Sequence, residues 1–127
     1  MAEATGFAPD VLERLRTRKL IRIETRRAVG APIHPTVIWV VVDARDRVLI
    51  RTYRGPASRW YREALAQPDC VLWMGEEAVA VHVETAPDPD RVAAASHGYE
   101  AKYAGDPAVR GMVAGPVLPT TLELKPR

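Results

Sequence analysis

The sequence predicts a mainly β fold with connecting helices (α+β), in which six antiparallel strands close into a small barrel. Three observations predict it. Short β-branched or alternating apolar runs recur along the chain, turn residues join them as hairpins, and helical spacing occurs only in the connections. A chain of 127 residues with 47% hydrophobic residues has the size of one unit, so we expect a single domain over residues 1–127.

The chain is expected to begin with a short helix and a half-buried strand. Val11, Leu12 and Leu15 have helical spacing, and Asp10 can cap the helix, which together with an arm makes up residues 1–18. Apolar and charged residues then alternate over residues 20–25, the pattern of a strand with one buried face.

A β-branched run and its hairpin partner follow. Residues 36–43 predict one continuous strand, residues 43–46 supply a turn, and residues 48–53 predict the returning strand. A helix is predicted over residues 58–67, and it ends there because Pro68 cannot continue it.

The second half of the chain predicts another hairpin, a longer helix and a last strand. Residues 71–74 and 78–85 are joined at Gly75, which can adopt the turn conformation that other residues avoid. The Asp88-Pro89 pair is typical of a helix start, and the helical spacing continues to Gly105. A looser stretch then leads to a strand over residues 120–124.

Composition and motifs exclude several classes of function. No apolar run is long enough to span a bilayer and the first residues lack signal-peptide features, so we expect a cytoplasmic protein without a membrane partner. The net charge is only +2 and the arginines concentrate near one turn, so no nucleic-acid partner is expected. The single cysteine, Cys70, lies in an apolar run and is interpreted as a core residue.

Metal sites and common catalytic motifs are not predicted either. His34, His82 and His97 are scattered and lack acidic partners at ligand spacing. Ser58 lacks the Gly-x-Ser-x-Gly motif of hydrolases, and the sequence contains neither GxGxxG nor a P-loop. No catalytic residue is nominated.

The segment around Ser58 predicts an anion site. A helix that starts after Ser58 presents unpaired backbone N–H groups, and Arg51, Arg54 and Arg59 are expected to bring positive charge to the same end. Together these features favour a bound phosphate.

The order of motifs after Ser58 resembles the flavin-binding split barrels, the pyridoxamine phosphate oxidase-like superfamily. Ser58-Arg59 is followed by an aromatic residue, a short helix, Gln67-Pro68 and an apolar strand. The resemblance extends from about Leu20 to the C-terminus. It implies a split barrel, a homodimer with the cofactor at the subunit junction, and a phosphate of flavin mononucleotide (FMN) held by Ser58 and Arg59.

A second resemblance is to the deazaflavin-dependent nitroreductases, and a small bacterial family of unknown function in the same superfamily is also similar. Gly55-Pro56 precedes Trp60-Tyr61, and residues 25–30 match that branch's loop in part, with Arg26 and Val29 in place of a glycine and a serine. FMN and a deazaflavin coenzyme therefore both stay open. The second strand lacks lysine and arginine, so oxidation of a vitamin B6 phosphate is not expected.

The leading hypothesis is an oxidoreductase that binds a flavin-type cofactor and acts on a small organic acceptor; the alternative is a non-catalytic ligand-binding or sensing module. The resemblance implies that main-chain groups flank the ring, that a Gly-Pro turn lets the backbone come close to the phosphate, and that an aromatic side chain forms one wall. The predicted cofactor-binding residues are Pro35, Thr36, Val37, Arg51, Thr52, Tyr53, Arg54, Gly55, Pro56, Ser58, Arg59 and Trp60.

Overall fold

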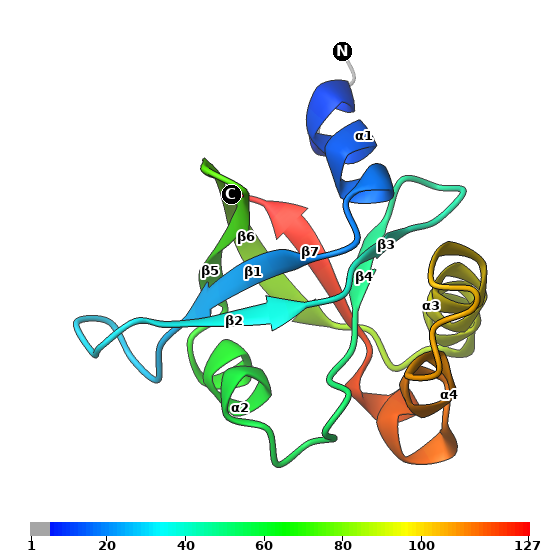
Figure 1. Cartoon of the computed structure of the whole chain (residues 1–127). Helices are drawn as coiled ribbons and strands as arrows, with labels where there is room; N and C mark the ends of the chain where they lie inside the picture. The colour runs from blue at the N-terminus through cyan, green and yellow to red at the C-terminus, as the bar shows by residue number, and fades with distance from the viewer. Residues whose placement is uncertain (1–5) are drawn as a thin grey trace.

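The computed structural model describes residues 6–127, which form one curled antiparallel sheet with helices at its connections (Figure 1). The strands are β1 (Ile21–Thr25), β2 (His34–Ile38), β3 (Val41–Val42), β4 (Val48–Ile50), β5 (Asp69–Met74), β6 (Glu77–Thr85) and β7 (Leu122–Pro126). The helices are α1 (Pro9–Thr17), α2 (Arg59–Ala66), α3 (Pro89–Lys102), α4 (Val109–Met112) and a 3₁₀ helix, Gly115–Thr120.

The sheet curls because its two edge strands are neighbours in the sequence. The strand order is β2-β1-β5-β6-β7-β4-β3, so β2 pairs with β1 at one edge and β3 pairs with β4 at the other. Only Trp39 and Val40 separate β2 from β3. A connection of two residues can reach between the two edges only if the sheet bends into a half-barrel. The prediction of a mainly β fold with antiparallel hairpins is confirmed.

The prediction of six strands is wrong, since the run over residues 36–43 forms two strands. Between these two strands, the side chains of Tyr99 and Lys102 on α3 and of Tyr103, which directly follows α3, replace the missing strand partners. Tyr99 donates a hydrogen bond to the carbonyl of Trp39 at 3.2 Å, and Lys102 Nζ donates to the carbonyl of Val40 at 2.7 Å. The N–H of Val40 donates to the Tyr103 hydroxyl at 3.2 Å. These bonds satisfy buried backbone groups that would otherwise be costly.

Two of the predicted turn and cap residues are confirmed and one is wrong. Asp88 caps α3, accepting a hydrogen bond from the N–H of Arg91, and Gly75 takes φ 64° in the turn between β5 and β6. Asp10, however, lies within the first turn of α1, because the helix begins one residue earlier at Pro9. Residues 1–5 of the predicted arm lie outside the described part of the chain.

The stretch predicted to be loose, after α3, is the part of the fold that the sequence pattern missed. It contains α4 and the 3₁₀ helix, which are too short to show helical periodicity. Met112 of α4 packs with Val41, Leu49 and Tyr99 in a core between α3 and the β3–β4 hairpin. This second core fixes α4 beside the open end of the sheet.

The larger core lies inside the curled sheet and contains Cys70, which is 2% exposed. Burial raises the pKa of the Cys70 thiol to about 11, so the interpretation of this residue as a core side chain is confirmed. Over residues 6–127, no helix combines the length and the apolar character needed to cross a membrane.

Candidate functional site

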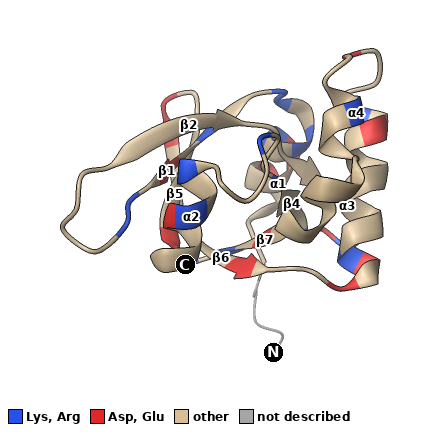
Figure 2. Cartoon of the chain, turned by 90° about the horizontal axis from the view of Figure 1, so that it is seen from below, with Lys and Arg blue, Asp and Glu red and all other residues tan. Residues whose placement is uncertain are grey.

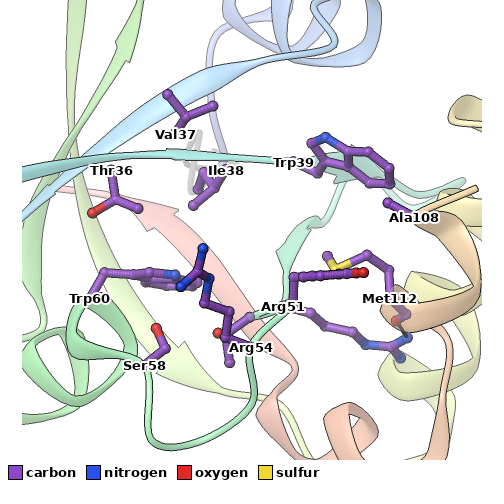
Figure 3. A pocket seen from close by; sticks show the side chains of 12 residues that line it. Thr36, Val37, Ile38, Trp39, Arg51, Arg54, Ser58, Trp60, Ala108 and Met112 are labelled. Atoms are coloured by element: carbon purple, nitrogen blue, oxygen red, sulfur yellow. Dashed lines mark hydrogen bonds between the residues drawn. The ribbon is translucent and has the colours of Figure 1, made fainter. Parts of the chain in front are cut away.

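A cavity of about 320 Å³ opens between β2, the segment after β4, the start of α2 and α4 (Figure 3). Its lining is mostly apolar and aromatic, with a few polar groups, which is the usual character of a small-molecule site. The lining residues are Thr36, Val37, Ile38, Trp39, Arg51, Thr52, Tyr53, Arg54, Ser58, Trp60, Ala108 and Met112.

Aromatic side chains from three different segments form the walls of this cavity. Trp60 on α2 is 7% exposed, Trp39 lies between β2 and β3, and Tyr53 follows β4 and is 56% exposed. Tyr53 rests on Gly111 of α4, where an added Cβ would lie 2.4 Å from its ring. The missing side chain at Gly111 therefore lets Tyr53 lie against α4. Sequence reasoning singled out Trp60 among the tryptophans as pocket-lining and missed Trp39.

The start of α2 lies at one side of the cavity and carries an unsatisfied polar atom. Ser58 occupies the N-cap position, as expected, but its side chain makes no capping hydrogen bond. Its Oγ is buried and has no hydrogen-bond partner within residues 6–127. Buried hydroxyls without a partner are uncommon in proteins and call for an explanation. A bound anion that accepts a hydrogen bond from Ser58 and from the first-turn N–H groups would provide one.

A second, more open cavity of about 640 Å³ adjoins the first on the outer side of this helix start. It shares Thr36, Val37, Arg54, Ser58 and Trp60 with the first cavity and adds Ala57, Arg59 and Arg62. Arg54 points from its loop toward β2 beside Trp60 (Figure 3). In the view from below, basic positions are coloured blue along α2, with an acidic one beside them (Figure 2).

Arg51 does not belong to this cluster of charge, and the prediction that it brings charge to the helix start is wrong. Its side chain is buried, and its guanidinium turns away from Ser58 toward α3, α4 and the 3₁₀ helix (Figure 3). Burial lowers the pKa of this guanidinium below its ordinary value. It donates to the carbonyls of Val92 and Met112 at 2.6 and 3.0 Å and to the hydroxyls of Thr121 and Ser96, both at 2.8 Å.

A buried carboxylate on α2 is a polar feature that the sequence did not reveal. Glu63 of α2 accepts a hydrogen bond from Thr25 at 2.8 Å, and its carboxylate lies 3.0 Å from Nδ1 of His34. The network joins α2 to the β1–β2 hairpin and so helps to fix the helix whose start carries Ser58. The sequence offered no signal for it, because Glu63 is far from both partners along the chain and lies at no ligand spacing from His34.

Most of the predicted cofactor-binding residues line one of the two cavities. The exceptions are Pro35, Gly55 and Pro56, which line neither. Gly55 instead shapes the loop, since it has φ 87° and its N–H donates to the carbonyl of Thr52 at 3.2 Å. In the part of the chain that the structure covers, no group of three or more His, Cys, Asp or Glu side chains is arranged to hold a metal ion.

Several solved structures share this fold at low sequence identity. The conserved hypothetical protein Rv2991 from Mycobacterium tuberculosis has a TM-score of 0.68 at 11% identity, over 98% of this chain and 82% of its own. HutZ, the heme storage protein from Vibrio cholerae, has a TM-score of 0.66 at 10% identity, over 96% and 91%.

A third similar structure comes from Nostoc punctiforme and is a pyridoxamine 5′-phosphate oxidase-related, FMN binding protein. Its TM-score is 0.51 at 15% identity, over 94% of this chain and 80% of its own. The chain therefore shares its fold with this protein, which is consistent with the split barrel that the resemblance implied.

The structural matches show the fold alone, whereas the sequence itself shows the family. No curated protein matches the sequence. Residues 11–124 match a family described as "Uncharacterized protein conserved in bacteria (DUF2255)". Because this match spans almost the whole chain, the protein belongs to the DUF2255 family.

Proposed function

We propose that the protein binds a flavin-type cofactor, FMN or a deazaflavin coenzyme, and passes hydride or electrons to a small organic acceptor. The observation that carries the proposal is the buried, unpartnered Oγ of Ser58 at the start of α2, at the seam between an apolar cavity and an arginine-lined one. The shared fold with an FMN-binding protein supports it.

The residues present suit both ends of such a cofactor. The apolar cavity between Trp39, Tyr53 and Trp60 suits a planar aromatic ring. Ser58 and Arg59, with the first-turn N–H groups of α2, would hold a phosphate. When bound, the cofactor supplies the redox chemistry itself, so the protein needs only to bind it, orient it and shield it from water.

The proposal includes a homodimer, because one wall of the site is left open. Val37 lines both cavities and is 58% exposed. Val37 is paired with Arg22 of β1, and Arg22 is paired with Trp73 of β5, so the three residues lie in one row across the sheet. Leu20, near this row, is 54% exposed, and together they form one face beside the site. A second copy packed on this face would cover these apolar side chains. Sedimentation of the purified chain is expected to give a mass of about 28 kDa, twice the 14.0 kDa of one chain; a monomer at high concentration would contradict it.

A non-catalytic ligand-binding module is the second candidate. Among residues 6–127, the apolar cavity is lined by no aspartate, glutamate, histidine, lysine or cysteine, and its hydroxyl groups, including those of Tyr53 and Ser58, have no such residue beside them in the lining to act as their base. The fold is shared with a heme storage protein as well as an FMN-binding one. The two functions differ in turnover: an oxidoreductase bleaches its bound cofactor with a reduced nicotinamide or another donor and recovers with an acceptor, whereas a carrier does not.

Equilibrium binding tests the proposal. The purified chain is titrated with FMN and, separately, with a deazaflavin coenzyme, and the cofactor fluorescence is followed. Saturable binding of either one supports the proposal and identifies the cofactor class. Binding of neither would contradict it and would favour the ligand-binding module.

Replacing Arg59 with alanine is expected to weaken binding of the preferred cofactor by about 1.5 kcal/mol, roughly tenfold, because one charge-assisted hydrogen bond is lost. The fold should be unchanged, since Arg59 is exposed. Arg45→Ala serves as the control, because it removes the same charge from a side chain that is 74% exposed and lines neither cavity. Equal cofactor affinities of the Arg59→Ala and Arg45→Ala variants would show that Arg59 does not contact the cofactor.

A further inference from the structure

The charge pattern at the start of α2 is unfavourable for a helix without a ligand. α1 and α3 carry Asp10 and Asp90 in their first turns, where negative charge complements the helix dipole. α2 has no acidic residue there; it begins with Arg59, and Arg62 follows three residues later. Cations at a helix N-terminus and like charges at this spacing both destabilise a helix slightly. Such a local conflict is typical of a binding site.

No carboxylate of residues 6–127 neutralises the three arginines that line the outer cavity, Arg54, Arg59 and Arg62. The arginines that form ion pairs are Arg14, Arg16, Arg45, Arg47, Arg91 and Arg127. Arg62 is held in place through its Nε, which donates to the carbonyl of Ala57 at 3.1 Å. Its two terminal nitrogens make no hydrogen bond to residues 6–127, so they are available to a ligand.

One phosphate held at Ser58 would leave part of the positive charge along this cavity, including that of Arg62, without an anionic partner. A phosphate monoester carries a charge of about −1.5 to −2 at neutral pH. Three guanidinium groups and the positive end of the α2 dipole, about half a unit, together exceed it. The outer cavity of about 640 Å³ also continues past Ser58 to Arg62, with room for more of the ligand.

Building on the proposed function, we propose that the ligand carries a second anionic group beyond the phosphate held at Ser58, and that Arg62 binds this group. The site would then favour a cofactor with a diphosphate or a carboxylate-bearing tail over a simple mononucleotide. Arginine suits both tails, because its planar fork binds phosphate and carboxylate in the same way.

The test compares ligands that differ only beyond the first phosphate, using the full chain, Arg62→Gln and the charge-matched control Arg45→Gln. FMN is compared with flavin adenine dinucleotide, which adds a second phosphate together with an adenosine, and a deazaflavin coenzyme with a carboxylate tail is compared with its tail-free form. One extended ligand is expected to bind about tenfold more tightly than its shorter partner, and Arg62→Gln is expected to abolish that advantage. The pair that shows the advantage identifies the tail.

A second readout separates this inference from the proposed function. Inorganic pyrophosphate and phosphate are titrated into the same three proteins, and the backbone amide signals of α2 are followed by NMR. Pyrophosphate is expected to bind more tightly than phosphate to the full chain and to the Arg45→Gln control, but not to Arg62→Gln. This result supports the second anionic group even if no flavin binds. In that case only the flavin proposal fails. Equal binding of short and extended ligands, unaffected by Arg62→Gln, overturns the second group and leaves flavin binding standing. Failure of every probe overturns both.

Discussion

Replacing Arg51 with methionine is expected to lower the free energy of unfolding by about 3–5 kcal/mol, the largest effect among the site residues. Methionine keeps much of the apolar stem but removes every donor. The carbonyls of Val92 and Met112 and the hydroxyls of Ser96 and Thr121 would each lose a hydrogen bond, those of Met112 and Thr121 in buried positions and the other two in partly buried ones. Unfolding by urea, followed by tryptophan fluorescence, measures the change.

Arg54→Met is the matched control, because the two arginines are three residues apart but differ in burial. Arg54 is exposed and makes no ion pair within the described chain, so its replacement is expected to change the free energy of unfolding by less than about 0.5 kcal/mol. It should instead weaken cofactor binding, as expected for a residue that lines both cavities. A stable Arg51→Met variant would show that this guanidinium is not needed to hold α3 and α4.

The contrast between these arginines explains what local sequence could and could not predict. The pattern Ser58-Arg59 before a short helix is local, so the start of α2 and its neighbouring arginines were predicted from spacing alone. The direction of the Arg51 side chain depends on α4 and the 3₁₀ helix, which have no periodic pattern of their own. Strand alternation places a residue on one face of a sheet but does not tell what covers that face.

Long-range pairing limited the other predictions in the same way. The hairpin around Gly75 was predicted because its two strands are adjacent in the sequence. The division of residues 36–43 into β2 and β3 requires α3, whose hydrogen bonds to Trp39 and Val40 come from about sixty residues away. Nor can the pairing of His34 with Glu63 be read from spacing, because the two are brought together only by packing of α2 on the hairpin.

Lys102 is expected to make the stability of the protein depend on pH. Its Nζ donates to the carbonyls of Leu15 and Val40 at 2.7 Å, in a partly buried position where no carboxylate of residues 6–127 forms an ion pair with it. Burial, and to a smaller degree the positive charge of Lys19, lowers the pKa of Lys102 to about 8 from the ordinary value of 10.5. The folded protein therefore releases this proton at a lower pH than the unfolded chain does.

The sign of the effect follows from proton binding. Between about pH 8 and pH 10.5 the unfolded chain holds more protons at Lys102 than the folded protein, so this group makes stability rise with pH. The penalty is fully present below pH 8 and is lost above pH 10.5. The full shift would correspond to about 3 kcal/mol, and solvent screening of a partly exposed group reduces it to about 2 kcal/mol.

Lys102→Arg isolates this contribution, because arginine keeps the charge and the donors but does not titrate in this range. Urea unfolding of both proteins is measured from pH 7 to pH 10.5. Over this range the free energy of unfolding of the wild type, minus that of the variant, is expected to rise by about 2 kcal/mol. Cys70 and Tyr103, whose pKa values burial raises to about 11 and about 12, make stability fall with pH near the top of this range. They are present in both proteins and largely cancel in the difference.

A constant difference between the two proteins across this range would contradict the lowered pKa of Lys102, whatever its size. A difference in free energy of unfolding that grows with pH would mean that the segment between β2 and β3 is hydrogen-bonded by a lysine whose buried charge destabilises the folded protein. The carbonyl of Val40 is the acceptor that this lysine satisfies, and Trp39 beside it forms one wall of the cavity. The geometry of the candidate site would then depend on a hydrogen bond that the protein keeps despite the electrostatic penalty of burying its donor.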